Sequence, residues 1–151
     1  MTGPATNDVI RPISICLFRH GHRILVCDLH DPTGNRHFYR PMGGGIEFGE
    51  TSLEALRREV QEELGVEISN PRLLGTLENI FVYDNRRGHE VVFVYDARLV
   101  DEQLYRTPCF QGVEDNGLPF DLCWIDVDAL GPDSPPLYPD GLLELLTNHS
   151  G

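Results

Sequence analysis

Positively charged residues are scarce in this sequence. Lysine and arginine together number 12 against 24 aspartates and glutamates, so the formal net charge is −12. A surface of this charge repels the phosphate backbone of a nucleic acid and an anionic membrane face. We therefore expect neither a nucleic acid nor a membrane as partner. A nucleotide is still admitted, because bound metal ions can reverse the sign locally.

The chain also lacks a long apolar run, close cysteine pairs and internal repeats. No run approaches the ~20 residues of a membrane span, and the polar residues 1–8 contain no signal-peptide core. The cysteines show no metal-ligand spacing. Three of them stand in apolar, strand-like runs, so we expect reduced core thiols rather than disulfides. The four are Cys16, Cys27, Cys109 and Cys123. These absences predict a cytoplasmic protein with a flexible N-terminus at residues 1–8.

The length of 151 residues suits one domain with a single core. The apolar content of 40% and the charged content of 24% are ordinary for a globular protein. We therefore expect residues 1–151 to form a single domain.

An acidic helix with clear ends is predicted over residues 52–64. Thr51 and Glu54 form a capping box, and Gly65 is the residue type that ends helices in a left-handed conformation. Apolar side chains recur at spacings of three and four along one stripe, which predicts a buried face. They are Leu53, Leu56, Val60 and Leu64.

Three glutamates of this helix share another side. Glu59, Glu62 and Glu63 stand at i, i+3 and i+4, so their carboxylates converge. Such oxygens are what Mg²⁺ binds, although an acidic helix face that is merely solvated is the common alternative. The preceding glycines favour the metal, because their backbone can approach a cation or a phosphate closely. Arg58 is placed to hold the carboxylates.

The segment from Gly44 to Val66 is similar to the signature of the Nudix hydrolases. That signature reads Gly, five residues, Glu, seven residues, then Arg-Glu-aliphatic-any-Glu-Glu-any-Gly-aliphatic. Every defined position is matched, by Gly44, Glu50, Arg58, Glu59, Val60, Glu62, Glu63, Gly65 and Val66. Family members often have a proline directly before the glycines, whereas here Met42 separates Pro41 from Gly43.

The resemblance implies an α/β fold, a Nudix-like α/β/α sandwich with a mixed sheet between helices. It implies hydrolysis of a nucleoside diphosphate linked to another group X, with Mg²⁺ as cofactor or Mn²⁺ in its place. Glu59, Glu62 and Glu63, with the carbonyl of Gly44, match the metal ligands. Arg58 matches the residue that orients them, and Glu50 matches a supporting carboxylate. The alternative is a non-catalytic module that binds or senses a nucleotide.

The general base remains open between several carboxylates. In the family it is either a signature glutamate or a carboxylate from a distant loop. Glu62 and Glu114 are the leading candidates, and Glu90 or Asp115 are alternates. Glu114 can equally well be a solvated surface residue with no role in catalysis, because most loop carboxylates are exposed.

Outside the signature, the alternation of apolar with polar residues and the positions of turn-forming residues predict the other strands and the last helix. Strands are expected at 10–18, 23–29 and 37–40, a hairpin at 72–83 and 89–99, a long loop at 101–121, a short strand at 124–127 and a closing helix at 140–146. The run after Glu90 is almost continuously apolar, which predicts a strand buried on both faces.

Three residues are candidates for substrate contact. Arg40 precedes the glycine loop, and its fork geometry suits phosphate oxygens. Tyr83 lies 17 residues after Val66, where enzymes resembling diadenosine-polyphosphate hydrolases often carry a tyrosine. Glu90 is costly to bury unpaired, so it lies at an exposed strand end or in the metal site. The group X stays open among nucleoside triphosphates, dinucleoside polyphosphates, ADP-ribose and nucleotide sugars. Homodimers are common among similar proteins.

Overall fold

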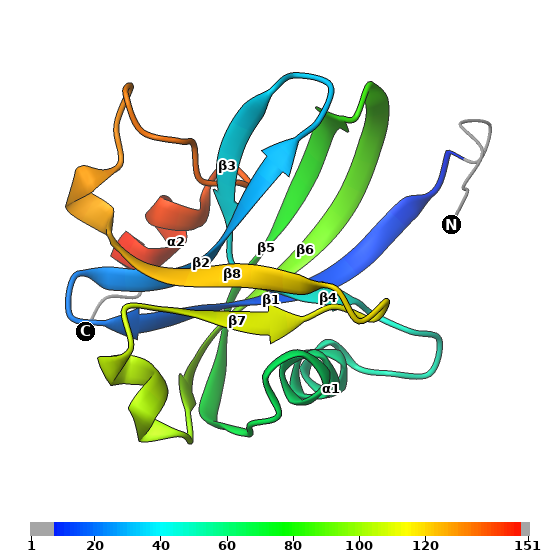
Figure 1. The fold of residues 1–151 in the computed structure, drawn as a ribbon. Coiled ribbons are helices and arrows are strands. Elements are labelled where there is room, and N and C mark those ends of the chain that lie inside the picture. The colour runs from blue at the N-terminus through cyan, green and yellow to red at the C-terminus, as the bar shows by residue number, and fades with distance from the viewer. Residues whose placement is uncertain (1–7, 149–151) are drawn as a thin grey trace.

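The computed structural model describes residues 8–148 and places an eight-stranded sheet between two helices (Figure 1). The strands are β1 Ile10–His20, β2 Arg23–Asp31, β3 Arg36–Arg40, β4 Met42–Gly45, β5 Ile68–Tyr83, β6 Arg86–Leu99, β7 Cys109–Val113 and β8 Pro119–Asp126. The helices are α1 Ser52–Leu64 and α2 Leu142–Asn148, with 3₁₀ turns η1 Glu102–Arg106 and η2 Val127–Ala129.

Strand β1 runs through the middle of the sheet. The hydrogen-bonded order is β5-β6-β1-β2-β8-β7, with β3 beside β2 and β4 beside β1. β1 is parallel to β6 and antiparallel to β2 and β4, so the sheet is mixed. Residues 13–18 of β1 are all buried. A strand covered on both faces reads as a nearly continuous apolar run, and this one does.

The two faces of the sheet carry separate cores. Leu56 and Val60 of α1 pack on one face, whereas Leu142 and Leu146 of α2 pack on the other. Figure 1 shows the two helices on opposite sides of the sheet. The predicted α/β/α sandwich is confirmed. Within the described residues, neither helix has the length and apolar character needed to cross a membrane.

Most of the predicted elements are confirmed with small changes at their ends. The helix at 52–64 has the predicted bounds. The hairpin of β5 and β6 is longer than predicted because its turn is only two residues, Asp84 and Asn85, at φ 51° and 61°. Positive φ at both positions is typical of the turn that suits the strand twist. The closing helix begins two residues later than predicted.

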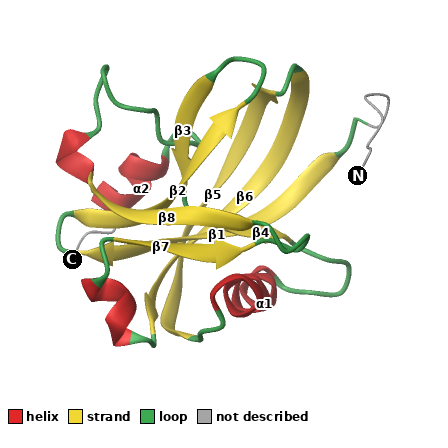
Figure 2. Ribbon diagram, in the orientation of Figure 1, coloured by secondary structure: helices red, strands yellow, loops and turns green. Residues whose placement is uncertain are grey.

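The long loop predicted at 101–121 is wrong. The segment contains η1, all of β7 and the start of β8. Strands β7 and β8 pair as an antiparallel hairpin (Figure 2). Gly112 interrupts the alternation of β7, and a Cβ there would meet the ring of Phe120 at 2.6 Å. The strand therefore needs a glycine where a pattern would show a side chain.

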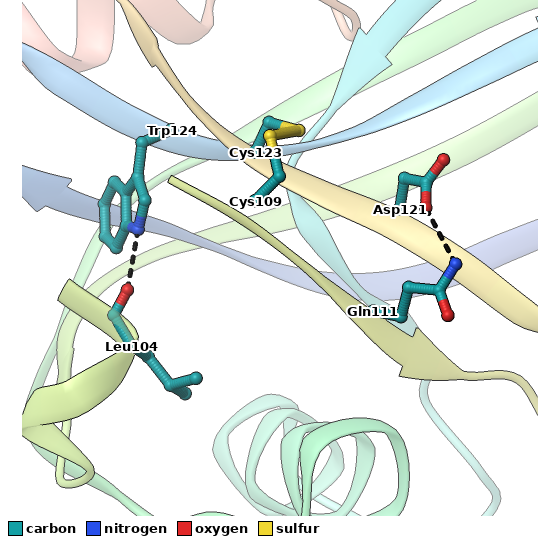
Figure 3. Close-up of a disulfide and its surroundings, with 6 residues drawn as sticks. All are labelled: Leu104, Cys109, Gln111, Asp121, Cys123 and Trp124. Atoms are coloured by element: carbon teal, nitrogen blue, oxygen red, sulfur yellow. Dashed lines mark hydrogen bonds between the residues drawn. A yellow bond between two sulfur atoms is a disulfide. The ribbon is translucent and has the colours of Figure 1, made fainter. Parts of the chain in front are cut away.

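The expectation of reduced thiols is correct for two cysteines and wrong for the other two. Cys16 and Cys27 are free and buried. Cys109 and Cys123 stand directly opposite each other in β7 and β8 and form a disulfide (Figure 3). Because Cys109 lies in the segment predicted as a loop, no strand register was available from which this pair could be predicted.

Candidate active site

Helix α1 is fixed at both ends by the residues that predict them. The Thr51 hydroxyl accepts the backbone N–H of Glu54 at 3.1 Å, and the Glu54 carboxylate accepts the N–H of Thr51 at 2.8 Å. Gly65 is left-handed at φ 70° and donates its N–H to the carbonyl of Gln61 at 2.9 Å. These caps satisfy backbone groups that a helix end otherwise leaves free, so the helix presents its glutamates at a defined place.

Arg58 joins the carboxylates at the start and middle of α1. Its guanidinium donates to both oxygens of Glu50 at 2.7 and 3.0 Å, to Glu59 at 2.9 Å and to Glu62 at 3.0 Å. It also donates to the carbonyl of Gly45 at 3.0 Å. The hydrogen bond from Arg58 lowers the pKa of Glu50 to about 2. One arginine thus connects the glycine strand to the glutamates of the helix.

Glu59 lies between α1 and the glycine strand β4. Its side chain is 10% exposed, and burial raises the pKa of its carboxyl group above the usual value. A Cβ at Gly44 would stand 2.6 Å from both of its carboxylate oxygens. A side chain at position 44 would therefore displace the Glu59 carboxylate, because this carboxylate lies directly against the backbone of β4.

The Gly44→Ala variant should displace the Glu59 carboxylate and lower kcat/KM by about 10²-fold, the effect of misplacing a reacting group by roughly 1 Å. Steady-state kinetics with the nucleoside diphosphate derivatives expected from the signature would measure this loss. Gly131→Ala is the matched control, since a Cβ at Gly131 meets nothing within 4 Å. Equal activity of the two variants would show that Glu59 needs no close approach to β4.

Glu63 is partly buried and lies close to several other carboxylates. Burial raises the pKa of Glu63 to about 8, helped by the charges of Glu59, Asp115, Glu114 and Glu62. Glu114 and Asp115 come from the turn between β7 and β8, where the Glu114 N–H bonds the carbonyl of Leu118 at 2.8 Å. The structure therefore brings the predicted loop carboxylates toward the helix glutamates.

These residues fit a divalent cation by their chemistry. Within residues 8–148, no three acidic, histidine or cysteine side chains are arranged closely enough to hold a metal. Arg58 donates hydrogen bonds to two of the glutamates, Glu59 and Glu62. The donors are nevertheless carboxylate oxygens, which hard cations prefer. Burial is the main cause of the raised pKa of Glu63, and the neighbouring negative charges that add to it are ones that a cation would compensate. The space beside Gly44 leaves its backbone close to the Glu59 oxygens.

A cleft of about 220 Å³ adjoins the glycine strand. Glu63 and Glu114 line it on the side of α1, and Arg40 and Glu90 line it on the side of β3 and β6. The remaining lining residues are Arg11, Ile13, Ile15, Cys27, Leu29, Pro41, Met42, Gly43, Gly44, Gly45 and Phe120. The cleft thus joins the acidic side of the site to a group of arginines.

The candidates for substrate contact fall into two places. Arg40 and Glu90 both line the cleft, and the Arg40 guanidinium donates to Glu90 at 3.0 Å. Glu90 is buried and paired, so the exposed strand end considered for it is wrong. Tyr83 lies outside the lining, at the end of β5, and its hydroxyl donates to the carbonyl of His30 at 3.3 Å.

Arg11 is a cleft residue that the sequence did not indicate. It precedes the buried run of β1 and stands opposite Glu90 in the parallel pairing of β1 with β6. Nothing in the local pattern distinguishes it from any exposed arginine. Only the register between two strands distant in sequence places it at the cleft.

The comparison with known families agrees with this geometry. A model of the NUDIX domain matches residues 10–144. The chain belongs to the Nudix family. The solved MutT NUDIX hydrolase of Burkholderia pseudomallei has the same fold, with a TM-score of 0.65 and 22% identity over 91% of this chain and 96% of that one. A NUDIX hydrolase of Nitrosomonas europaea gives a TM-score of 0.57 at 19% identity, over 80% and 74%.

Curated relatives of this Nudix protein include NAD-capped RNA hydrolases called NudC. The Pasteurella multocida protein is 30% identical over 131 residues, which cover 87% of this chain and 44% of that protein. The Haemophilus influenzae protein is 39% identical over 77 residues, which cover 49% and 28%. The chain therefore spans less than half the length of these relatives.

Proposed function

We propose that this protein is a pyrophosphohydrolase that cleaves the pyrophosphate linkage of a nucleoside diphosphate joined to another group X, with Mg²⁺. The observation that carries the proposal is the set of α1 glutamates, ordered by Arg58 and Gly44, beside a cleft that also contains arginines. Carboxylates that hold a cation and arginines that meet phosphate are what this hydrolysis needs.

Each residue takes a defined part in this proposal. Glu59, Glu62 and Glu63, with the Gly44 carbonyl, would hold the cation. A bound divalent cation neutralises pyrophosphate charge and makes a water a better nucleophile. Arg58 keeps the glutamates in position.

The chain must also supply a base for the attacking water. Glu62 and Glu114 are the leading candidates. Glu62 is 47% exposed on its side chain, and one of its oxygens accepts a hydrogen bond from Arg58 at 3.0 Å. Glu114 lines the cleft on the same side as Glu63, from the β7–β8 turn. The alternates are Asp115, on the same turn, and Glu90, which is paired with Arg40.

The decisive experiment is product release from a panel of nucleotides, with Mg²⁺ and with EDTA. The panel holds nucleoside triphosphates, ADP-ribose, nucleotide sugars and diadenosine polyphosphates. We expect cleavage of at least one member with Mg²⁺ and loss of more than about 10²-fold of that rate in EDTA, because charge neutralisation at phosphoryl groups is a large term. Tight binding of a member without cleavage of any would support the nucleotide-sensing module instead.

The names of the curated relatives extend the panel. Because NudC proteins are called NAD-capped RNA hydrolases, NAD and an RNA with a 5′ NAD cap should be included. The net charge of −12 argues against the RNA body as a contact. Cleavage of capped RNA with a KM far below that for NAD would overturn this part of the proposal.

Other parts of the proposal extend beyond the site. Mg²⁺ rather than Mn²⁺, a single domain over residues 1–151, a homodimer and a cytoplasmic location stay predictions. The Cys109–Cys123 disulfide stands against the cytoplasmic location, since such bonds are rare in reducing compartments.

A further inference from the structure

Glu90 of β6 is a buried carboxylate that contacts side chains from three other strands. Its side chain is 4% exposed. Arg40 of β3 donates to it at 3.0 Å, Asn79 of β5 donates at 3.3 Å, and the guanidinium of Arg11 on β1 lies 4.0 Å from its second oxygen. A buried carboxylate is stable only when it is paired, and here each oxygen has its own arginine.

These arginines are the cations of the cleft. Among the described residues that line it, only Arg11 and Arg40 carry positive charge. The whole chain contains no lysine, so the side-chain cations that this cleft can offer a phosphate are arginines. Around Glu90, two guanidinium groups against one carboxylate leave a net positive charge, whereas Glu63 and Glu114 make the α1 side of the cleft negative. A guanidinium has five N–H donors, and the bond of Arg40 to Glu90 uses one of them.

A purely structural role explains Arg40 better than it explains Arg11. The Arg11 side chain is 60% exposed. An ion pair at that exposure and at 4.0 Å contributes little to folding. Its guanidinium also lies beside the glycine strand, 3.2 Å from the position that a Cβ of Gly45 would take. Arg11 is therefore held at the cleft and remains accessible from solvent.

We propose that Arg11 and Arg40 bind a phosphoryl group of the substrate beyond the pyrophosphate held at α1, and that Glu90 positions them. This inference rests on the proposed function and narrows its substrate to nucleotides with three or more phosphates. The α1 site and the β7–β8 turn together carry many carboxylates, so a further phosphate needs cations of its own. ADP-ribose and nucleotide sugars have no such phosphate.

The test compares ATP and Ap4A with ADP-ribose, which shares the ADP part. Arg11→Gln and Arg40→Gln should each raise KM for ATP or Ap4A by about 10- to 30-fold, the effect of losing charge-assisted hydrogen bonds. kcat should change less than about threefold, because the contact binds ground state and transition state alike. KM for ADP-ribose should stay within about twofold. The two polyphosphates distinguish a terminal further phosphate from a bridging one.

Variants of Glu90 and a matched control complete the design. Glu90→Gln keeps the shape and loses the charge that attracts Arg11, so KM for the polyphosphate should rise by about fivefold. A fall in kcat of about 10²-fold or more would instead identify Glu90 as the general base and would overturn its positioning role. A fall in KM would show that Glu90 competes with phosphate and would overturn its positioning role. Arg106→Gln removes the same charge from exposed η1 and should leave KM unchanged.

Two results would overturn the inference while leaving the proposed function intact. One is cleavage of ADP-ribose without cleavage of ATP or Ap4A. The other is an equal KM increase on ADP-ribose and on the polyphosphate in the Arg11 and Arg40 variants. Failure of the proposed function itself looks different, since then no member of the panel is cleaved by the unmodified protein.

Discussion

In the Glu63→Gln variant, kcat/KM should fall by about 10³-fold on whichever nucleotide the protein hydrolyses. The variant removes one carboxylate of the proposed metal site, and electrostatic contacts of this kind are worth about 10²- to 10³-fold each. A 10³-fold loss corresponds to about 4 kcal/mol of transition-state stabilisation. Kinetics at saturating Mg²⁺ would measure the loss of kcat/KM. Calorimetric titration of Mg²⁺ into the protein should show weaker binding of the cation in the same variant.

The stability of this variant should move in the opposite direction. Glu63 is half-buried near other carboxylates, which raises its pKa to about 8. Without metal, folding at neutral pH therefore requires this carboxyl group to take up a proton that it lacks in the unfolded chain, and glutamine removes that cost. We expect the unfolding midpoint in EDTA to stay equal or rise. Glu67→Gln is the matched control, because Glu67 is exposed just beyond α1. Retained activity in Glu63→Gln would refute the assignment of this glutamate to the metal site.

Arg58→Lys should cost both activity and stability although it keeps the charge. Lysine is a point charge and cannot reproduce the fork that reaches Glu50, Glu59 and the Gly45 carbonyl together. We expect kcat/KM to fall by about 10²-fold. The free energy of unfolding should fall by about 2 kcal/mol, within the range for hydrogen bonds to charged groups. Urea unfolding gives the second quantity.

Arg57→Lys is the control for this comparison. Arg57 is the neighbouring, exposed arginine and donates to the Ile68 carbonyl at 3.3 Å, away from the carboxylates. It should change kcat/KM by less than about twofold. If the two lysine variants behaved alike, the fork geometry of Arg58 would have no special part in ordering the site.

Local chemistry made α1 predictable from the sequence. Thr51 and Glu54 fix its start and Gly65 fixes its end through contacts within a few residues, so no knowledge of the rest of the fold is needed. The same holds for Glu59 and Arg58, which are neighbours on one helix. Their roles in catalysis stay predictions, but their positions follow from helix geometry.

Features that depend on strand register could not be predicted in this way. The Cys109–Cys123 disulfide needs the pairing of β7 with β8, and that hairpin was hidden by Gly112. Arg11 reaches Glu90 only because β1 and β6 run side by side. Alternation shows which side chains share a face of a strand, but it carries no information about which strand comes next to it.

The parallel pairing of β1 with β6 also bears on how the chain is made. Ile10 of β1 pairs with His89 of β6, so this pairing of the central strand cannot form until β6 has been synthesised, much later than β1. Helix α1 is synthesised between the two and can form by its own caps, but the sheet on which it docks is incomplete until β6 emerges. Contacts this distant in sequence slow folding. Because Glu90 of the cleft lies on β6, the cleft is completed only after most of the chain has been synthesised, although every residue of the Nudix signature has been made before that strand.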